Sequence, residues 1–255
     1  MKILVVGDVV GRPGRKILQD RLQGIVDTRR IDFVIVNGEN AAGGKSITPA
    51  IVKEFQSMGV DVITSGNHIW DNSEIVKVLD SEPTLLRPAN YPAPARGYGY
   101  HIADRRGVRI CVVDLQGRLF MDPIDCPFRK FDEIYKEVRE RSDIIIVDFH
   151  AEATSEKRAL GWHLDGRASA LYGTHTHVMT ADEEILPRGT GFITDIGMTG
   201  SFDSVIGVNK ENAVRRFLTF TRVRFEVAEK NCKVNAVLFE INREGKTESI
   251  VRIIA

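Results

Sequence analysis

Three short runs of aliphatic residues near the N-terminus constrain the fold of this chain more than any other feature. They span residues 3–6, 33–36 and 60–64, and each is nearly continuous in Val and Ile. Strands covered on both faces have this composition, whereas a half-solvated strand alternates apolar and polar residues. Amphipathic stretches separate the runs, so the sequence predicts βαβ units around a buried parallel sheet.

Two helices are predicted between these strands. The first begins near Pro13, and the second has Thr48 as its N-cap, Pro49 at its first position and Gly59 as its stop. Their apolar faces carry Leu18, Leu22 and Ile25 in the first helix and Ile51, Phe55 and Met58 in the second. The spacing of these residues is helical.

The rest of the chain predicts a second sheet, and the whole is interpreted as one α/β domain spanning residues 1–255. Strand signals lie at residues 98–103, 109–113, 144–147, 168–172 and 192–195, with a helical stretch at 131–142. Four of the nine prolines fall in 83–99, which predicts a long ordered loop at the rim of the site. Residues 233–241 and 248–254 predict a hairpin that closes the fold as an edge.

Composition excludes several classes of protein. The 35 basic and 35 acidic residues cancel, so no overall field attracts nucleic acid or an anionic membrane. The three cysteines form no CxxC pair, which argues against disulfides and thiolate metal sites and favours a reducing cytoplasm. The first apolar run is too short for a signal peptide, and no stretch is long enough to span a membrane. We expect a soluble, cytoplasmic protein.

The apolar runs repeatedly end in metal-binding residue types. Open α/β sheets build their sites at such strand ends, so we expect these side chains to converge. The set comprises Asp8, Glu39, Asn40, Asn67, His68, His150, His175 and His177.

Taken singly, each residue has a structural alternative. Asp8 is a reasonable N-cap, Glu39 and Asn40 suit a turn, and a lone His150 is more often a core residue than a ligand. His175 and His177 are harder to explain structurally, because residues i and i+2 of a strand share one face and address one cluster. Nitrogen and oxygen ligands without thiolate suit Mn, Fe, Zn or Ni, and their number implies two ions and a hydrolytic reaction.

The order of these motifs resembles the calcineurin-like metallophosphoesterase superfamily along the whole chain. GNH at 66–68 and GTHTH at 173–177 match that pattern most specifically. The resemblance implies a four-layer α/β/β/α sandwich with mixed sheets and a metal site at the carboxyl ends of strands. Two positions depart from the pattern: Val10 replaces the first histidine of DxH, and Glu39 replaces the bridging aspartate.

The segments GDVVGRPGR, NGENAAGG, SGNHIWD and YGTHTHV resemble the bacterial YmdB-like subgroup, whose members are similar to 2',3'-cyclic-nucleotide phosphodiesterases. The resemblance implies one metal held by Asp8, Glu39, Asn40 and His177. It implies a second metal held by Glu39, Asn67, His150 and His175, so that Glu39 bridges the two.

The resulting hypothesis is attack on phosphorus by a hydroxide that bridges two metals, most simply Fe, with Mn or Zn as alternatives. His68 is the expected general acid, which Asp71 orients, while His101 and His163 are interpreted as packing residues. Two rivals stay open: a phosphomonoesterase or nucleotidase on the same cluster, and a non-catalytic RNA-associated scaffold. The expected partner is a small phosphodiester, and the sequence leaves an RNA substrate and a homo-oligomer open.

Overall fold

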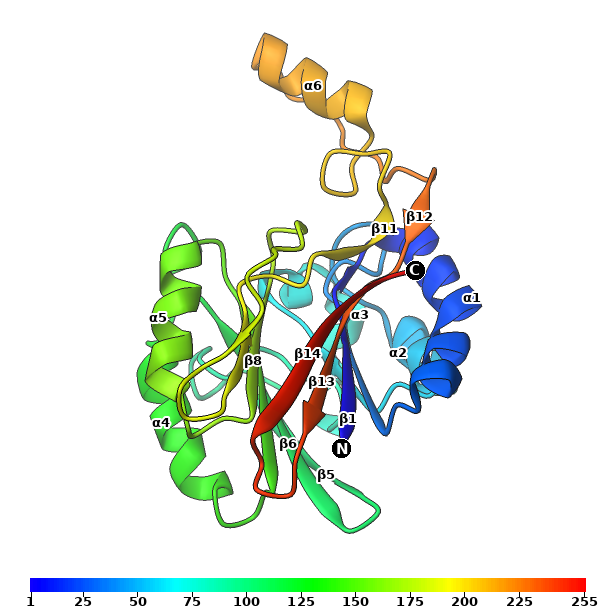
Figure 1. Cartoon of the computed structure of the whole chain (residues 1–255). Helices are drawn as coiled ribbons and strands as arrows, with labels where there is room; N and C mark the ends of the chain where they lie inside the picture. The colour runs from blue at the N-terminus through cyan, green and yellow to red at the C-terminus, as the bar shows by residue number, and fades with distance from the viewer.

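A computed structural model describes residues 1–255 and arranges them in four layers, with two sheets face to face and helices on their outer sides (Figure 1). In the first sheet three strands run parallel, and the C-terminal hairpin adds two antiparallel strands at one edge. Its strand order is β14 (Thr247–Ile254), β13 (Asn235–Ile241), β1 (Lys2–Val6), β3 (Phe33–Asn37) and β4 (Val62–Thr64).

The second sheet has four parallel strands with an antiparallel strand at each edge. Its order is β5 (Tyr100–Arg105), β6 (Val108–Gln116), β7 (Ile144–His150), β8 (Ala170–Thr174), β10 (Gly191–Ile193) and β9 (Glu184–Ile185). The parallel strands of both sheets are buried on both faces, as the continuous Val and Ile runs predict.

Three hydrophobic clusters fill the three spaces between the four layers. Along β1, Ile3 and Val5 belong to the cluster between the sheets, while Leu4 and Val6 belong to the cluster under the helices. This alternation follows from the two-residue period of a strand. The helices are α1 (Gly11–Arg29), α2 (Pro49–Ser57) and α3 (Ser73–Val76) on the first sheet, and α4 (Pro127–Val138) and α5 (Thr154–Leu164) on the second.

The predicted elements are present with small shifts at their ends. In α2, the hydroxyl of Thr48 accepts a hydrogen bond from the Ile51 amide, and Gly59 follows with a φ of 86°. Both observations match the predicted cap and stop. Ile25 and Met58 are only partly buried, because each lies at the edge of its helix's apolar face.

Residues 83–99 form the predicted loop without regular structure, apart from isolated bridges. The loop joins the two sheets at one edge: the Leu86 amide donates to the Ile63 carbonyl beside β4, and the Ala89 amide donates to the Asp114 carbonyl in β6. Short 3₁₀ turns, η1 (Asn67–Asp71) and η2 (Leu79–Ser81), precede it.

A third, small sheet and the segment that it carries have no counterpart among the sequence-based predictions. Its order is β12 (Cys232–Lys233), β11 (Met198–Ser201) and β2 (Asp8–Val9). Between β11 and β12 lies an arm, residues 202–231, whose helix α6 (Lys210–Thr219) stands away from the four layers (Figure 1). None of the helices combines the length and apolar character needed to cross a membrane.

Candidate metal centre

The seven predicted ligands lie together where five strands end. Contacts of 3.0 to 3.9 Å connect all of them into one cluster. Asp8 lies in β2, Glu39 and Asn40 follow β3, Asn67 opens η1 after β4, His150 ends β7, and His175 and His177 follow β8. Four of them, Asp8, Glu39, Asn40 and His150, are buried, and the other three are partly exposed.

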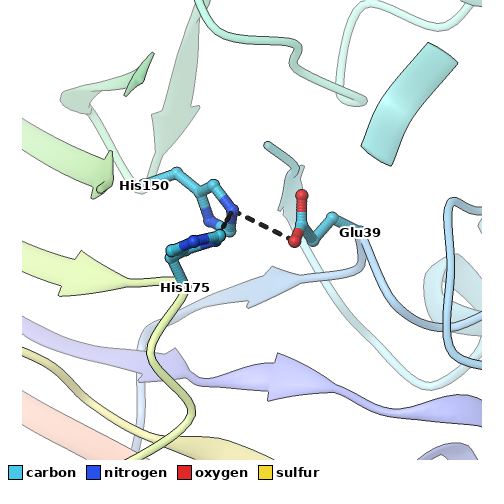
Figure 2. A group of neighbouring side chains, drawn as sticks. All are labelled: Glu39, His150 and His175. Atoms are coloured by element: carbon cyan, nitrogen blue, oxygen red, sulfur yellow. Dashed lines mark hydrogen bonds and ion pairs between the residues drawn. The ribbon is translucent and has the colours of Figure 1, made fainter. Parts of the chain in front are cut away.

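The contacts fall into two groups that share Glu39. On one side, Nε2 of His150 lies 3.0 Å from Oε1 of Glu39, 3.2 Å from Oδ1 of Asn67 and 3.0 Å from Nδ1 of His175. Figure 2 shows Glu39, His150 and His175 pointing toward one another. Ligand atoms of these three residues all lie within 4.8 Å of one another.

On the other side of Glu39 lie Asn40, His177 and Asp8. The amide nitrogen of Asn40 is 3.2 Å from Oε1 of Glu39 and 3.1 Å from Nε2 of His177, which is itself 3.8 Å from Oδ1 of Asp8. The backbone amide of His175 donates to Oδ2 of Asp8 at 3.2 Å, so the two groups are also in direct contact.

The outer nitrogen of His150 is fixed by a chain of hydrogen bonds. Oγ1 of Thr174 donates to Oδ1 of Asp148 at 2.7 Å, so it accepts from Nδ1 of His150 at 2.9 Å. The proton of the neutral ring therefore lies on Nδ1, and the lone pair of Nε2 points into the cluster. Outer-shell acceptors orient metal-binding imidazoles in this way.

His177 and His175 are oriented in the same manner. The carbonyl of Ile206 accepts from Nδ1 of His177 at 2.8 Å, which leaves Nε2 unprotonated toward Asp8. Oε2 of Glu152 lies 3.2 Å from Nε2 of His175, which leaves Nδ1 toward His150. All three rings thus turn a lone pair inward.

Such an arrangement needs positive charge at its centre. Inward lone pairs and two buried carboxylates repel one another, and Oδ1 of buried Asp8 has no hydrogen-bond partner. A buried carboxylate oxygen that accepts no hydrogen bond is suited to bind a cation. The donor set of imidazole, carboxylate and amide, with no thiolate nearby, fits divalent first-row transition metals.

The pKa values reflect the same crowding. Burial opposes ionisation of Glu39, but attraction and hydrogen bonding to His150 outweigh it and lower the pKa of Glu39 to about 2. Burial likewise opposes charging of His150, yet Glu39 and Asp8 raise its pKa to about 9. Burial and repulsion from His150 lower the pKa of His175 to about 3. The carboxylates thus draw one proton into the cluster, a charge that bound metal would replace.

His175 and His177 lie in a loop, so the prediction that they share one face of a strand is wrong. The strand β8 ends at Thr174, and the two histidines have φ values of 94° and 65°. A side chain other than glycine adopts this left-handed region only at a cost. The turn, rather than the pleat, aims both rings at the cluster.

A buried ion pair supports the loop that carries His175 and His177. Nζ of Lys157 lies 2.7 Å from Oδ2 of Asp195, and both side chains are at most 1% exposed. Lys157 also donates to the carbonyl of Thr174, while Asp195 accepts from the amide and hydroxyl of Thr176. These bonds fix the residues before and after His175.

The cluster opens into a cavity of about 450 Å³. His68 lines it, and Oδ2 of Asp71 accepts from Nδ1 of His68 at 2.9 Å, the orientation that the sequence predicts. Glu152, Ile206 and Phe225 also line it. None of residues 83–99 does, so the prediction that this loop rims the site is wrong; it is used instead to join the sheets.

Sequence reasoning missed the supporting roles of four residues of this site: Asp148, Lys157, Thr174 and Asp195. A charged residue inside an apolar run, as in IIIVDFH and FITDIG, is the signal that marks Asp148 and Asp195. No local pattern marks the others. His101 in β5 and His163, whose Nε2 lies 3.0 Å from Asp132, are outside the cluster.

Comparisons with known proteins cover the whole chain. A family model described as "YmdB-like protein" matches residues 4–253. The chain is 48% identical over 246 residues to a 2',3'-cyclic-nucleotide 2'-phosphodiesterase of Bacillus subtilis (strain 168), covering 96% of this chain and 93% of that protein.

Solved structures also match over the whole length of this chain. A hypothetical protein from Thermus thermophilus superposes with a TM-score of 0.94 at 42% identity, covering 100% of this chain and 99% of its own. A structure described as a novel phosphatase from Mycoplasma pneumoniae has a TM-score of 0.94 at 34% identity, with 100% and 93% coverage. A 5'-nucleotidase precursor, also from T. thermophilus, shares the fold over 54% of its length, at 13% identity and a TM-score of 0.61. These matches confirm the predicted sandwich.

Proposed function

We propose that this chain, which belongs to the YmdB-like family of metallophosphoesterases, is a two-metal phosphodiesterase that hydrolyses 2',3'-cyclic nucleotides. The activity named for the B. subtilis relative supports a phosphodiester substrate. One observation carries the metal part: three imidazoles each turn one ring nitrogen toward a cluster with two buried carboxylates, and each outer nitrogen already has an acceptor.

The two groups of contacts suggest how the ligands divide. Asp8, Asn40 and His177 would hold one ion, while Asn67, His150 and His175 would hold the other. Glu39 lies between the groups and would bridge them. The amide nitrogen of Asn40 faces the cluster, and half a turn of that amide presents Oδ1 in its place.

When bound, two such ions would supply Lewis acidity at the phosphate and would lower the pKa of water there. The ring of His68 reaches the cavity with Nε2 unengaged, since Nδ1 is bonded to Asp71. His68 would donate a proton from Nε2 to the departing 2'-oxygen, and the carboxylate of Asp71 would stabilise the protonated ring. The product is a 3'-phosphomonoester.

The charge of the cavity favours a diester over a monoester. Lys45 is the one lysine or arginine that lines it, against the carboxylates of Glu39, Glu152 and Glu226. A monoester dianion needs more cationic side chains than a diester monoanion does. The charges of the residues that line the cavity therefore support the nucleotidase alternative less than the phosphodiesterase.

We infer that iron is the native metal, with manganese or zinc as alternatives; the nitrogen and oxygen donors accommodate all three. Metal analysis of protein purified without added metal identifies the native pair. We expect two ions per chain.

The test is turnover of 2',3'-cyclic AMP by the purified chain loaded with Fe or Mn, compared with turnover of nucleoside monophosphates. Glu39→Gln conserves shape but removes the bridging charge, whereas Glu244→Gln makes the same change in an exposed turn far from the cluster. We expect hydrolysis of the cyclic diester, lost in the first variant and kept in the second.

Hydrolysis of monoesters alone would replace the proposal with a nucleotidase. Full activity of Glu39→Gln would contradict the two-metal mechanism. Bound metal without turnover of either substrate would favour the non-catalytic scaffold.

A further inference from the structure

The arm, residues 202–231, concentrates positive charge on a chain whose net charge is zero. It carries six lysines and arginines against four acidic residues, and within residues 211–225 four arginines face a single acidic residue, Glu211. None of the four guanidinium groups forms an ion pair with a carboxylate, whereas nine of the 19 arginines elsewhere in the chain do. The four are Arg215, Arg216, Arg222 and Arg224. A row of uncompensated cations is typical of a surface that binds a polyanion.

Exposed aromatic rings lie among these arginines. Phe217 is 79% exposed and Phe220 is 98% exposed, at the end of α6 and directly after it. Bases of single-stranded nucleic acids stack on such rings, and arginines between them neutralise the phosphates.

The arm is continuous with the catalytic cavity. Phe225 lines that cavity, and the guanidinium of Arg216 lies 5.0 Å from the centre of the Phe225 ring. Arg216 also lines a second hollow, of about 280 Å³, together with Phe217, Phe220 and Arg222. A path of alternating aromatic and basic side chains therefore leads from the metal centre onto the arm.

The chemistry of the proposed substrate requires such a path only for longer molecules. When an RNA strand is cleaved through its own 2'-hydroxyl, the new 3' end carries a 2',3'-cyclic phosphate. With that ring at the metal centre, the rest of the strand must leave the cavity from the 5'-oxygen of the last nucleotide. A mononucleotide has nothing to place on the arm.

We propose that the arm binds the strand of an oligoribonucleotide whose terminal 2',3'-cyclic phosphate lies at the metal centre, so that RNA 3' ends are the substrate class. Arg216 and Arg222 contact the backbone phosphates, while Phe220 and Phe225 stack with bases. This inference rests on the proposed phosphodiesterase function and adds the identity of its substrate.

The same charge disfavours a protein partner on this surface. Val214, Phe217 and Leu218 form an apolar stripe at helical spacing, which a second copy of the chain would bury. That copy would bring its own arginine-rich arm close to this one, and like charges repel each other. A polyanion instead neutralises them.

The test compares kcat/KM of the metal-loaded enzyme for 2',3'-cyclic AMP and for a five-nucleotide RNA ending in adenosine 2',3'-cyclic phosphate, over a range of salt concentrations. The variant is Arg216→Ala combined with Arg222→Ala. The control is Arg139→Ala combined with Arg243→Ala, two exposed arginines off the arm. Molar mass in solution is measured for every variant.

We expect kcat/KM of the wild type to be about tenfold or more higher for the RNA than for 2',3'-cyclic AMP. One phosphate contact or one stacked base contributes an effect of about this size. The arm variant should lose most of that preference, and its salt dependence should become shallower by about one power of concentration for each phosphate contact removed. The control should behave like wild type.

Equal kcat/KM for the two substrates, unchanged in the arm variant, would overturn this inference and leave the phosphodiesterase function standing. A drop in molar mass of the arm variant with an unchanged RNA preference would also overturn it and assign the arm to a second copy. Absence of turnover of either substrate by the wild type would overturn both proposals.

Discussion

The metal centre and the arm depart from the usual distribution of side chains in opposite directions. Beneath the metal centre, ionisable groups such as Asp8, Lys157 and Asp195 are completely buried, whereas on the arm Phe217 and Phe220 are almost fully exposed. Buried charge is costly unless it is paired or bound to metal, and exposed apolar surface of this size is uncommon unless it binds something.

This difference separates the residues that stabilise the fold from the residues that are available for recognition. Each buried charge is held by several partners, so removing one leaves the others uncompensated. The arm contacts the body at its base, where the Ile206 carbonyl accepts from His177 and Phe225 lines the cavity, while α6 stands clear of the four layers (Figure 1). We therefore expect changes in the first region to affect folding, and changes at the exposed side chains of α6 and at Phe220 to affect binding alone.

The largest effect on stability should come from breaking the buried pair. Lys157→Met leaves the Asp195 carboxylate buried without its cation, and we expect a loss of about 3–5 kcal/mol in the free energy of unfolding, measured with urea. The loop that carries His175 loses its support as well. Adding Asp195→Leu to this variant should recover part of the loss, because no charge then stays unpaired. An unchanged unfolding midpoint in Lys157→Met would show that the pair does not support the fold.

Removal of metal should have the next largest effect. Ligands that bind only the folded state raise its stability by mass action, so Mn²⁺ at about 100 times its dissociation constant should add about 2.7 kcal/mol. Melting curves with Mn²⁺ and with a chelator measure this difference. The difference should vanish in Glu39→Gln. Identical curves for wild type under both conditions would contradict a metal centre at this position.

A smaller effect is expected at Gly66, where the backbone touches the cluster. A Cβ at this position would lie 2.2 Å from Cδ2 of His150 and 2.3 Å from Oε2 of Glu39. Gly66→Ala should therefore cost about 1–3 kcal/mol as overpacking and reduce bound metal. Gly24→Ala in α1 is the control: its Cβ meets nothing within 4 Å, and stability should rise slightly. Full metal content in Gly66→Ala would show that the cluster tolerates displacement.

The smallest effect should come from the arm. Phe217→Ser combined with Phe220→Ser removes side chains that are already 79% and 98% exposed. The free energy of unfolding should therefore change by less than about 0.5 kcal/mol. A large loss of stability, measured with urea as above, would show that these rings are buried in solution. That result would remove the contrast between the two regions.

Local sequence patterns predicted most of the fold. The Val and Ile runs became β1, β3 and β4, and the cap and stop signals around Pro49 and Gly59 placed α2 within two residues. Such signals act over a few residues, so they can be recognised without the rest of the structure. The arm and the three-stranded sheet carry no comparable signal, since β2 and β12 are two residues long.

The sequence by itself determined which residue types follow each strand and in which order, and hence the seven predicted ligands, whose metal-binding role stays a prediction. Only the tertiary structure decided how they point. Thr174 and Ile206 orient His150 and His177, and the Lys157–Asp195 pair joins residues 38 positions apart. Hydrophobic periodicity records which side of an element is buried, but the orientation of an imidazole depends on acceptors that folding brings from distant segments.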